Sequence, residues 1–398
     1  MKILQYREDK KCGNKLSVLG LGCMRFPGGI GRIDKEKTEA LLLKAYKHGI
    51  NYYDTAYLYP GSEEVVGEIF AKHSLREKVY IATKLPQALC SSNSDFDKYF
   101  NIQKKRLHTG YIDYYLMHNF TDYAQWEKLC GLGIEKWITE KKNSGEIKQI
   151  GFSFHGPYSE FIKLLDNYNW DFVQIQFNYI NTNYQAGTEG LLYAANKGLP
   201  IFIMEPLLGG KLANLPPSAN EVFQKVQPGS TGASWGLRFI WDFPGVTLLL
   251  SGMGTEAQLE ENVKLAETSM PNSLTEVERQ AIQEVKAVFN KNYKVPCTGC
   301  NYCMPCPKKI NIPACFEAYN ASYAVGLMSG IQQYMTTIGG TSNFAHYASD
   351  CIECGKCESH CPQHIEIRKQ LKAVKKRLQF PGTKALLSLA RKVMAKRM

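Results

Sequence analysis

The cysteines in the last quarter of the chain have a spacing suited to metal–sulfur chemistry. The sequence contains 13 cysteines, and nine of them follow residue 296. Gaps of two residues place several thiolates in one tight loop, where they can face a single metal centre. Two runs have these gaps: Cys297, Cys300, Cys303 and Cys306 before Pro307, and Cys351, Cys354, Cys357 and Cys361 before Pro362.

The second run resembles those of bacterial ferredoxins, in which the cysteine before the proline ligates the other of two clusters. Eight such cysteines predict two [4Fe–4S] clusters. The first run departs from this pattern, because two residues rather than three precede its last cysteine, so Cys315 is an alternative ligand. Disulfide bonds or zinc sites could also use these cysteines, but repeated Cys-x-x-Cys with Cys-Pro endings favours clusters. The resemblance implies that Cys297, Cys300 and Cys303 share a cluster with Cys361, and Cys351, Cys354 and Cys357 with Cys306.

The first 290 residues alternate short apolar runs with amphipathic segments, in units of roughly 30 residues that indicate a parallel sheet. We therefore predict an α/β fold in which a (β/α)8 TIM barrel precedes a small, mainly helical, ferredoxin-like iron–sulfur domain. An open doubly wound sheet is the alternative, but no Gly-x-Gly-x-x-Gly follows the first strand. The expected strands are 16–22, 51–54, 79–83, 112–117, 147–151, 172–176, 201–204 and 246–250, and one helix is expected over 126–142.

Domain limits follow from composition. We expect the barrel over residues 1–290, the cluster domain over 291–380 and a basic tail over 381–398. The net charge is +11, and the segment 367–398 holds eleven Lys and Arg with no Asp or Glu, so the rest is neutral. This segment predicts docking of an acidic partner such as a ferredoxin or flavodoxin, or weak binding to an anionic membrane surface. A solvated tail that only aids solubility is the alternative.

Other classes of protein are not indicated. No apolar run approaches the ~20 residues of a membrane span, and residues 1–14 do not resemble a signal peptide. The cysteine usage indicates a reducing compartment, so we expect a cytoplasmic protein. Nothing resembles a nucleic-acid-binding module.

Ionisable residues end three successive predicted strands: Asp54, Lys84 and His118. Tyr59 follows Asp54 in the next loop. Chemistry in such barrels occurs at the C-terminal ends of strands. A lone buried histidine or an Asp–Lys pair is more often structural, but four such residues together favour a site.

The segments that carry these four residues resemble the aldo-keto reductases, and the resemblance covers nearly all of residues 15–270. It implies that Tyr59 donates a proton to a carbonyl oxygen while a hydride reaches the carbon. A free phenol, with a pKa of about 10, is a reluctant donor. Lys84 would stabilise the phenolate, Asp54 would hold Lys84 charged, and His118 would bind the carbonyl oxygen. The substrate would be a small carbonyl compound or alcohol.

The resemblance also implies an NAD(P)H site. Gln176 stands where the family binds the nicotinamide carboxamide, and Ser153 also matches. The asparagine expected after that serine is Phe154. Met204 replaces the aromatic residue that normally stacks on the nicotinamide.

On the adenosine side, Glu261 and Asn262 match the family. Gly252 and Gln258 stand where NADP-binding relatives supply a lysine and an arginine, so NADPH preference is not supported. NADH is one alternative. A flavin is another, since barrels bind phosphates through loops after their last strands, and loops 207–210 and 251–254 are rich in glycine.

Three functions fit these features. The first is an aldo-keto reductase-type enzyme whose clusters relay electrons to or from a ferredoxin-like partner. The second is a plain NAD(P)H-dependent carbonyl reductase with structural or redox-sensing clusters. The third is a non-catalytic electron-transfer subunit, which the retention of all four site residues disfavours.

Overall fold

The computed structural model describes residues 4–28, 32–268, 270–324, 326–335, 346–380 and 382. The chain forms two compact units, each built from two separate stretches of sequence. The first comprises Met1–Leu207 and Ala233–Thr275, and the second Leu208–Gly232 and Glu276–Met398. The predicted basic tail, 381–398, lies outside the described residues except for Gly382. Within the described ranges, every helix is too short or too polar to span a bilayer.

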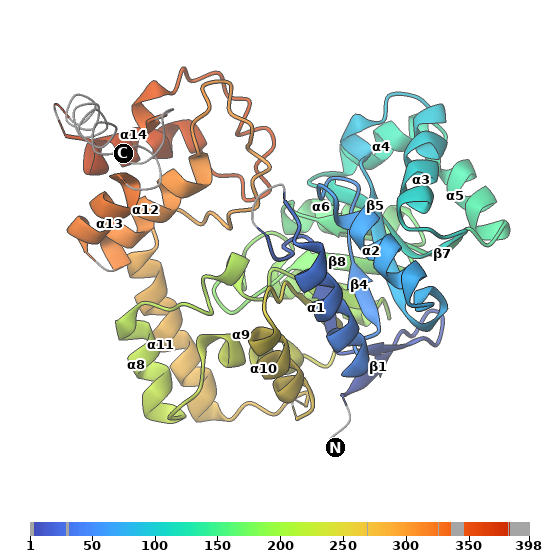
Figure 1. The fold of residues 1–398 in the computed structure, drawn as a ribbon, viewed down its shortest axis with the longest axis horizontal. Coiled ribbons are helices and arrows are strands. Elements are labelled where there is room, and N and C mark those ends of the chain that lie inside the picture. Colours follow the sequence, from blue (N-terminus) through green and yellow to red (C-terminus); the bar gives the residue numbers. More distant parts are fainter. Residues whose placement is uncertain are drawn as a thin grey trace. The chain divides into compact units, whose positions relative to one another are not determined.

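The first unit is a closed barrel of parallel strands in the order β10-β3-β4-β5-β6-β7-β8-β9, which confirms the predicted fold. Figure 1 labels β4, β5, β7 and β8 of this barrel. A short hairpin, β1 (Tyr6–Glu8) with β2 (Lys15–Ser17), precedes it. The expected strand 16–22 is therefore divided between this hairpin and the barrel. The barrel strands are β3 (Leu19–Gly22), β4 (Tyr52–Asp54), β5 (Tyr80–Leu85), β6 (Ile112–Phe120), β7 (Ile147–Phe154), β8 (Phe172–Gln176), β9 (Ile201–Met204) and β10 (Val246–Ser251).

Amphipathic helices follow the barrel strands and bury their apolar faces. In α1, Leu41, Leu42 and Ala45 are buried, and the Asp34 side chain caps the helix by accepting from the Lys37 amide. The helix expected over 126–142 is wrong. It is two helices, because Gly133 has a left-handed φ of 86° and ends the first of them. The helices of this unit are α1 (Lys35–Lys47), α2 (Ser62–Lys72), α3 (Ser94–Arg106), α4 (Tyr123–Gly131), α5 (Ile134–Asn143), α6 (Tyr158–Asn167), α7 (Gly187–Asn196), α9 (Gly232–Trp241) and α10 (Glu256–Ala266).

Large buried side chains from alternate strand positions fill the barrel interior. Tyr52 and Tyr114 meet edge to face with centroids 5.2 Å apart, and Phe202 packs on both. Because side chains on a strand alternate with period two, the residue two positions further along points to the same interior. The interior face therefore continues toward the C-terminal end of each strand.

The second unit is mainly helical. Its core joins α12, α13 and α14 through buried Cys315, Phe316, Tyr334 and Leu371. Arg377 fastens α14 to α12, because its guanidinium lies 3.7 Å above the Tyr323 ring and donates to Ser322. Helix α8 packs against α11. The helices are α8 (Pro217–Val226), α11 (Glu276–Asn292), α12 (Ile312–Ala324), α13 (Leu327–Tyr334) and α14 (Ile367–Leu378).

Candidate active site and cluster pockets

Polar side chains replace the apolar ones at the C-terminal end of the barrel interior. Tyr52 is followed two positions later by Asp54, and Ala82 by Lys84. Leu116 is likewise followed by His118. Since β4, β5 and β6 are neighbours in the barrel, these three residues end adjacent strands on the same inward face. The pleat of the strands thus places them at one mouth of the barrel.

Lys84 is a fully buried cation held by two partners. Its ammonium group contacts both carboxylate oxygens of Asp54 and donates to the Thr55 carbonyl at 2.7 Å. Lys84 is 0% exposed and Asp54 is 3% exposed. Burial raises the pKa of the Asp54 carboxyl, and the adjacent Lys84 ammonium opposes that rise. Because an isolated buried ion is very costly, each of these groups requires the other.

Tyr59 lies against both Lys84 and His118. The Lys84 Nζ atom is 5.1 Å from the centroid of the Tyr59 ring, and the imidazole of His118 meets that ring edge-on at 5.9 Å. Burial, Lys84 and His155 hold the pKa of His118 well below its usual value. His118 is therefore neutral at physiological pH and suited to hydrogen bonding with a carbonyl oxygen. The structure brings all four predicted catalytic residues together.

The side chain of Gln176 is the clearest observation that bears on a dinucleotide. It ends β8 and is 0% exposed, yet neither its oxygen nor its nitrogen has a hydrogen-bond partner among the described residues. Such a buried amide normally finds a partner. A carboxamide, which donates and accepts, would satisfy both atoms, so this residue fits a nicotinamide.

The other predicted cofactor residues lie on the same side of the barrel, at or after β7, β9 and β10. Ser153 accepts from the Asn119 amide at 2.7 Å, and Asn262 donates to Ser251 at 3.0 Å. The Gln258 side chain accepts from the Gly254 amide at 2.9 Å. The contacts of Asn262 and Gln258 shape the loop after β10, whereas that of Ser153 joins β7 to β6. The remaining positions are Met204 at the end of β9, Gly252 directly after β10 and Glu261 within α10.

Close packing accounts for a glycine in one of the two loops expected to approach a flavin phosphate. A Cβ atom at Gly209 would lie 2.2 Å from the Thr298 carbonyl oxygen, and Gly209 has a φ of 68°. Glycine is therefore required there for packing within the second unit. No such constraint applies at Gly252 or Gly254, where a Cβ would make ordinary contacts. Packing thus explains Gly209 without a flavin phosphate, whereas it does not explain Gly252 or Gly254.

Two further polar residues at the barrel mouth, His155 and Glu205, were not predicted. His155 directly follows β7 and is buried close enough to His118 to affect its pKa. Glu205 directly follows β9 with a left-handed φ of 56°. Burial raises the pKa of Glu205 to about 7, while nearby Arg25 opposes the rise. A polar residue just after a barrel strand was the available signal for both.

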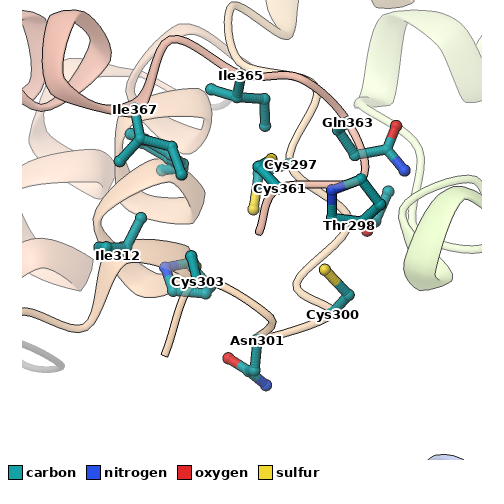
Figure 2. A pocket seen from close by; sticks show the side chains of 13 residues that line it. Cys297, Thr298, Cys300, Asn301, Cys303, Ile312, Cys361, Gln363, Ile365 and Ile367 are labelled. Atoms are coloured by element: carbon teal, nitrogen blue, oxygen red, sulfur yellow. The ribbon is translucent and has the colours of Figure 1, made fainter. Parts of the chain in front are cut away.

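Four of the predicted ligand cysteines surround one pocket of the second unit. Cys297, Cys300, Cys303 and Cys361 line it together with apolar residues of 312–316 and 362–367 (Figure 2). Burial raises the pKa of Cys303, and the other three cysteines raise it further. Thiols gathered in this way ionise with difficulty unless cations compensate, which fits iron ligation.

A second group of cysteines lies around Cys357. Burial raises the pKa of Cys357 to about 11, and Cys351 and Cys306 contribute to the rise. Cys354 is exposed, whereas Cys315 is buried in α12 near Cys306. Among the described residues, no group of three His, Cys, Asp or Glu side chains is arranged to hold a metal ion.

Replacement of Cys361 tests whether this residue ligates the same cluster as Cys297, Cys300 and Cys303. We expect Cys361→Ser to lose about half of the iron and acid-labile sulfide, because one of two clusters loses a ligand. Cys315→Ser is the matched control, since Cys315 is equally a cysteine of this unit but lies in a helix core. Iron and sulfide analysis of anaerobically purified protein measures both. Full iron in Cys361→Ser, or a loss in Cys315→Ser, would contradict the assignment.

A pH titration tests the position of Glu205 at the barrel mouth. Its carboxyl is neutral below pH 7 and ionises as the pH rises through its raised pKa. The ionised form repels an anionic dinucleotide, so NADH should bind more weakly above about pH 7. Fluorescence titration with NADH should show this inflection in the wild type and a flat profile in Glu205→Gln. An unchanged inflection in the variant would exclude Glu205 as its source.

Comparison with known proteins gives two family matches. Residues 18–284 match the Aldo/keto reductase family, and residues 296–366 match the 4Fe-4S dicluster domain. The aldo-keto reductase yakc of Schizosaccharomyces pombe, whose name includes NADP(+), is 28% identical over 156 residues. That match covers 36% of this chain and 44% of the relative, so the chain spans less than half the relative's length.

Other matches are longer and cover most of the matched protein. The uncharacterized oxidoreductase YqkF of Bacillus subtilis is 26% identical over 304 residues, which is 67% of this chain and 92% of YqkF. The holo structure of aldo-keto reductase AKR11C1 from Bacillus halodurans aligns with a TM-score of 0.58 and 22% identity. It covers 71% of this chain and 96% of AKR11C1, and supports the fold. This chain belongs to the aldo/keto reductase family and carries a 4Fe-4S dicluster domain after its barrel.

Proposed function

We propose that this protein is an oxidoreductase that reduces a carbonyl group, or oxidises an alcohol, at the barrel mouth. Its two [4Fe–4S] clusters would relay electrons to or from a ferredoxin-like partner. The observation that carries the proposal is the contact of the Tyr59 ring with both the Lys84 ammonium and the His118 imidazole.

The four residues divide the proton chemistry between them. Tyr59 would donate the proton to the substrate oxygen or receive it in the reverse direction. Lys84 stabilises the phenolate form by its positive charge, and Asp54 keeps that charge in place. His118, which is neutral, orients the oxygen by a hydrogen bond. The Tyr59 side chain is half-buried, so a substrate can reach it.

Gln176, Ser153 and Asn262 would hold a nicotinamide dinucleotide. When bound, the dinucleotide would supply or accept a hydride, whereas each cluster would exchange single electrons. A flavin, which can exchange both, would be needed to divide the electron pair of the hydride between the clusters. NADH is favoured over NADPH by the charges near the start of α10. Glu256 and Glu260 both pair with Lys44, at 2.7 and 2.5 Å, so that lysine is already occupied. An added 2′-phosphate would meet carboxylates there.

The two groups of cysteines would hold the two clusters. A hydride carries two electrons, and two clusters that each take one electron match this number. We assign Cys297, Cys300, Cys303 and Cys361 to one cluster and Cys306, Cys351, Cys354 and Cys357 to the other. Since thiolate ligands need a reducing environment, we also propose that the protein works in the cytoplasm.

Anaerobic turnover with NADH and a panel of aldehydes, ketones and quinones tests the proposal. The wild type should oxidise NADH when a substrate is present, and its cluster absorbance should change during turnover. Tyr59→Phe should lose at least about 100-fold in turnover, because it lacks the proton donor. Its NADH affinity should stay within about twofold of the wild-type value, because no hydroxyl contact to the dinucleotide is proposed.

The outcomes separate the three functions. Turnover with unchanged cluster absorbance would favour a plain reductase with structural clusters. Clusters that accept electrons in a protein that reduces no carbonyl compound would favour a non-catalytic electron-transfer subunit. Equal turnover in Tyr59→Phe and the wild type would refute the role of Tyr59.

A further inference from the structure

Helix α14 presents a strongly basic face to solvent. Its opposite face is apolar, and Leu371, Val374 and Leu378 are buried in the core of the second unit. The helix contains no acidic residue, so nothing within it neutralises the cations. The exposed basic residues are Arg368, Lys369, Lys372, Lys375 and Lys376.

This face lies beside the loop that carries the second cysteine run. Lys372 pairs with Glu353 at 2.8 Å, and Arg368 pairs with Glu358 at 2.6 Å. The Arg368 guanidinium would also lie 3.8 Å from a Cβ placed at Gly355. These contacts join both ends of the loop to the helix. The basic face and the loop therefore form one continuous surface of the same unit.

The loop exposes a predicted cluster ligand and an apolar side chain. Cys354 is exposed, whereas Cys351 and Cys357 are half-buried. The apolar side chain of Ile352 is 56% exposed to solvent. Protein interfaces commonly have an apolar centre and a charged rim. Ile352 and Cys354 would supply such a centre, and electrons would have little distance to cross there.

Some of the surrounding cations are already neutralised and others are not. The carboxylates of Glu353, Glu358 and Glu366 pair with Lys372, Arg368 and Lys369. Lys356, Lys375 and Lys376 make no ion pair within the described part of the chain and are exposed. The surface therefore keeps a positive charge that an acidic protein would complement.

We infer that residues 352–356 and the basic face of α14, together called the docking surface, bind a small acidic electron-carrier protein of the ferredoxin class. The inference rests on the proposed function and places the exchange at the cluster of the second cysteine run. Each encounter moves one electron: this unit is oxidised by one electron as the carrier is reduced by one, or the reverse. No bond forms and no proton is transferred.

Reversal of the two unpaired helix lysines tests the docking surface. A fluorescently labelled acidic bacterial ferredoxin is the probe, and anisotropy measures its Kd anaerobically at low salt. We expect the Lys375→Glu/Lys376→Glu variant of the full chain to raise Kd at least about tenfold. The difference should shrink above ~0.3 M salt, because exposed charges are then screened within a few ångströms.

A matched variant controls for net charge. Lys47 and Lys105 are exposed lysines in the last turns of α1 and α3 on the first unit, and neither makes an ion pair within the described residues. Lys47→Glu/Lys105→Glu changes the charge by the same amount and should leave Kd within about twofold. Ile352→Ser should weaken binding without changing its salt dependence. Full iron content in each variant verifies that the unit is folded.

Two results would overturn the docking surface. One is equal weakening of binding in both double-lysine variants, which would indicate a response to overall charge alone. The other is a wild-type Kd for Lys375→Glu/Lys376→Glu. If deletion of residues 383–398 then abolished binding, the carrier would bind that segment and not the docking surface. Neither result touches the carbonyl chemistry, because the turnover of NADH with carbonyl compounds is measured without the carrier. Loss of that turnover with intact ferredoxin binding would refute the proposed function alone.

Discussion

A charged ammonium group lies at the mouth of the barrel, away from water, and the neighbouring side chains are arranged around it. Lys84 is stable there only because Asp54 and the Thr55 carbonyl surround its Nζ atom. The register of β4 against β5, in which Asp54 lies opposite Ala82, brings the two charged groups together. The position of the ammonium then determines the electrostatic environment of Tyr59. Burial is the main cause of the low pKa of His118, and the ammonium lowers that pKa further.

The two units use charge in opposite ways. The barrel buries its critical charges in pairs, so their effect is strong and local. The second unit gathers thiols in pockets and leaves lysines on its surface, where their effect is longer in range and sensitive to salt. The first arrangement suits the movement of a proton and a hydride at one substrate. The second would suit the proposed docking of a partner protein.

Part of this organisation could be predicted from the sequence because it repeats along the chain. The strand rhythm predicted the barrel, and the last inward positions of three strands predicted Asp54, Lys84 and His118. The resemblance of the cysteine runs to those of ferredoxins likewise predicted which cysteines line one pocket. His155 was missed because β7 was expected to end at Gly151, although Phe152, Ser153 and Phe154 extend it.

Other features depend on contacts between residues far apart in the sequence. The glycine at 209 reflects the approach of Thr298, which no local pattern reveals. The division of the helix expected over 126–142 depends on the backbone at Gly133, which a count of apolar residues overlooks. Pairing of Lys372 with Glu353 likewise shows which cations of the basic segment are neutralised. In each case the sequence shows which type of residue is present, but only the folded structure shows which distant residue it contacts.

The central claim is that Asp54 and Lys84 act as one unit on Tyr59, and a double-mutant cycle tests it most directly. The measurement is kcat/KM of Asp54→Asn, Lys84→Met and the double variant, with NADH and the best carbonyl substrate. Each value is normalised to the concentration of protein that contains its iron–sulfur clusters. If the pair acts as a unit, the double variant loses no more activity than the worse single variant. Losses that multiply, or full activity in Asp54→Asn, would contradict the account.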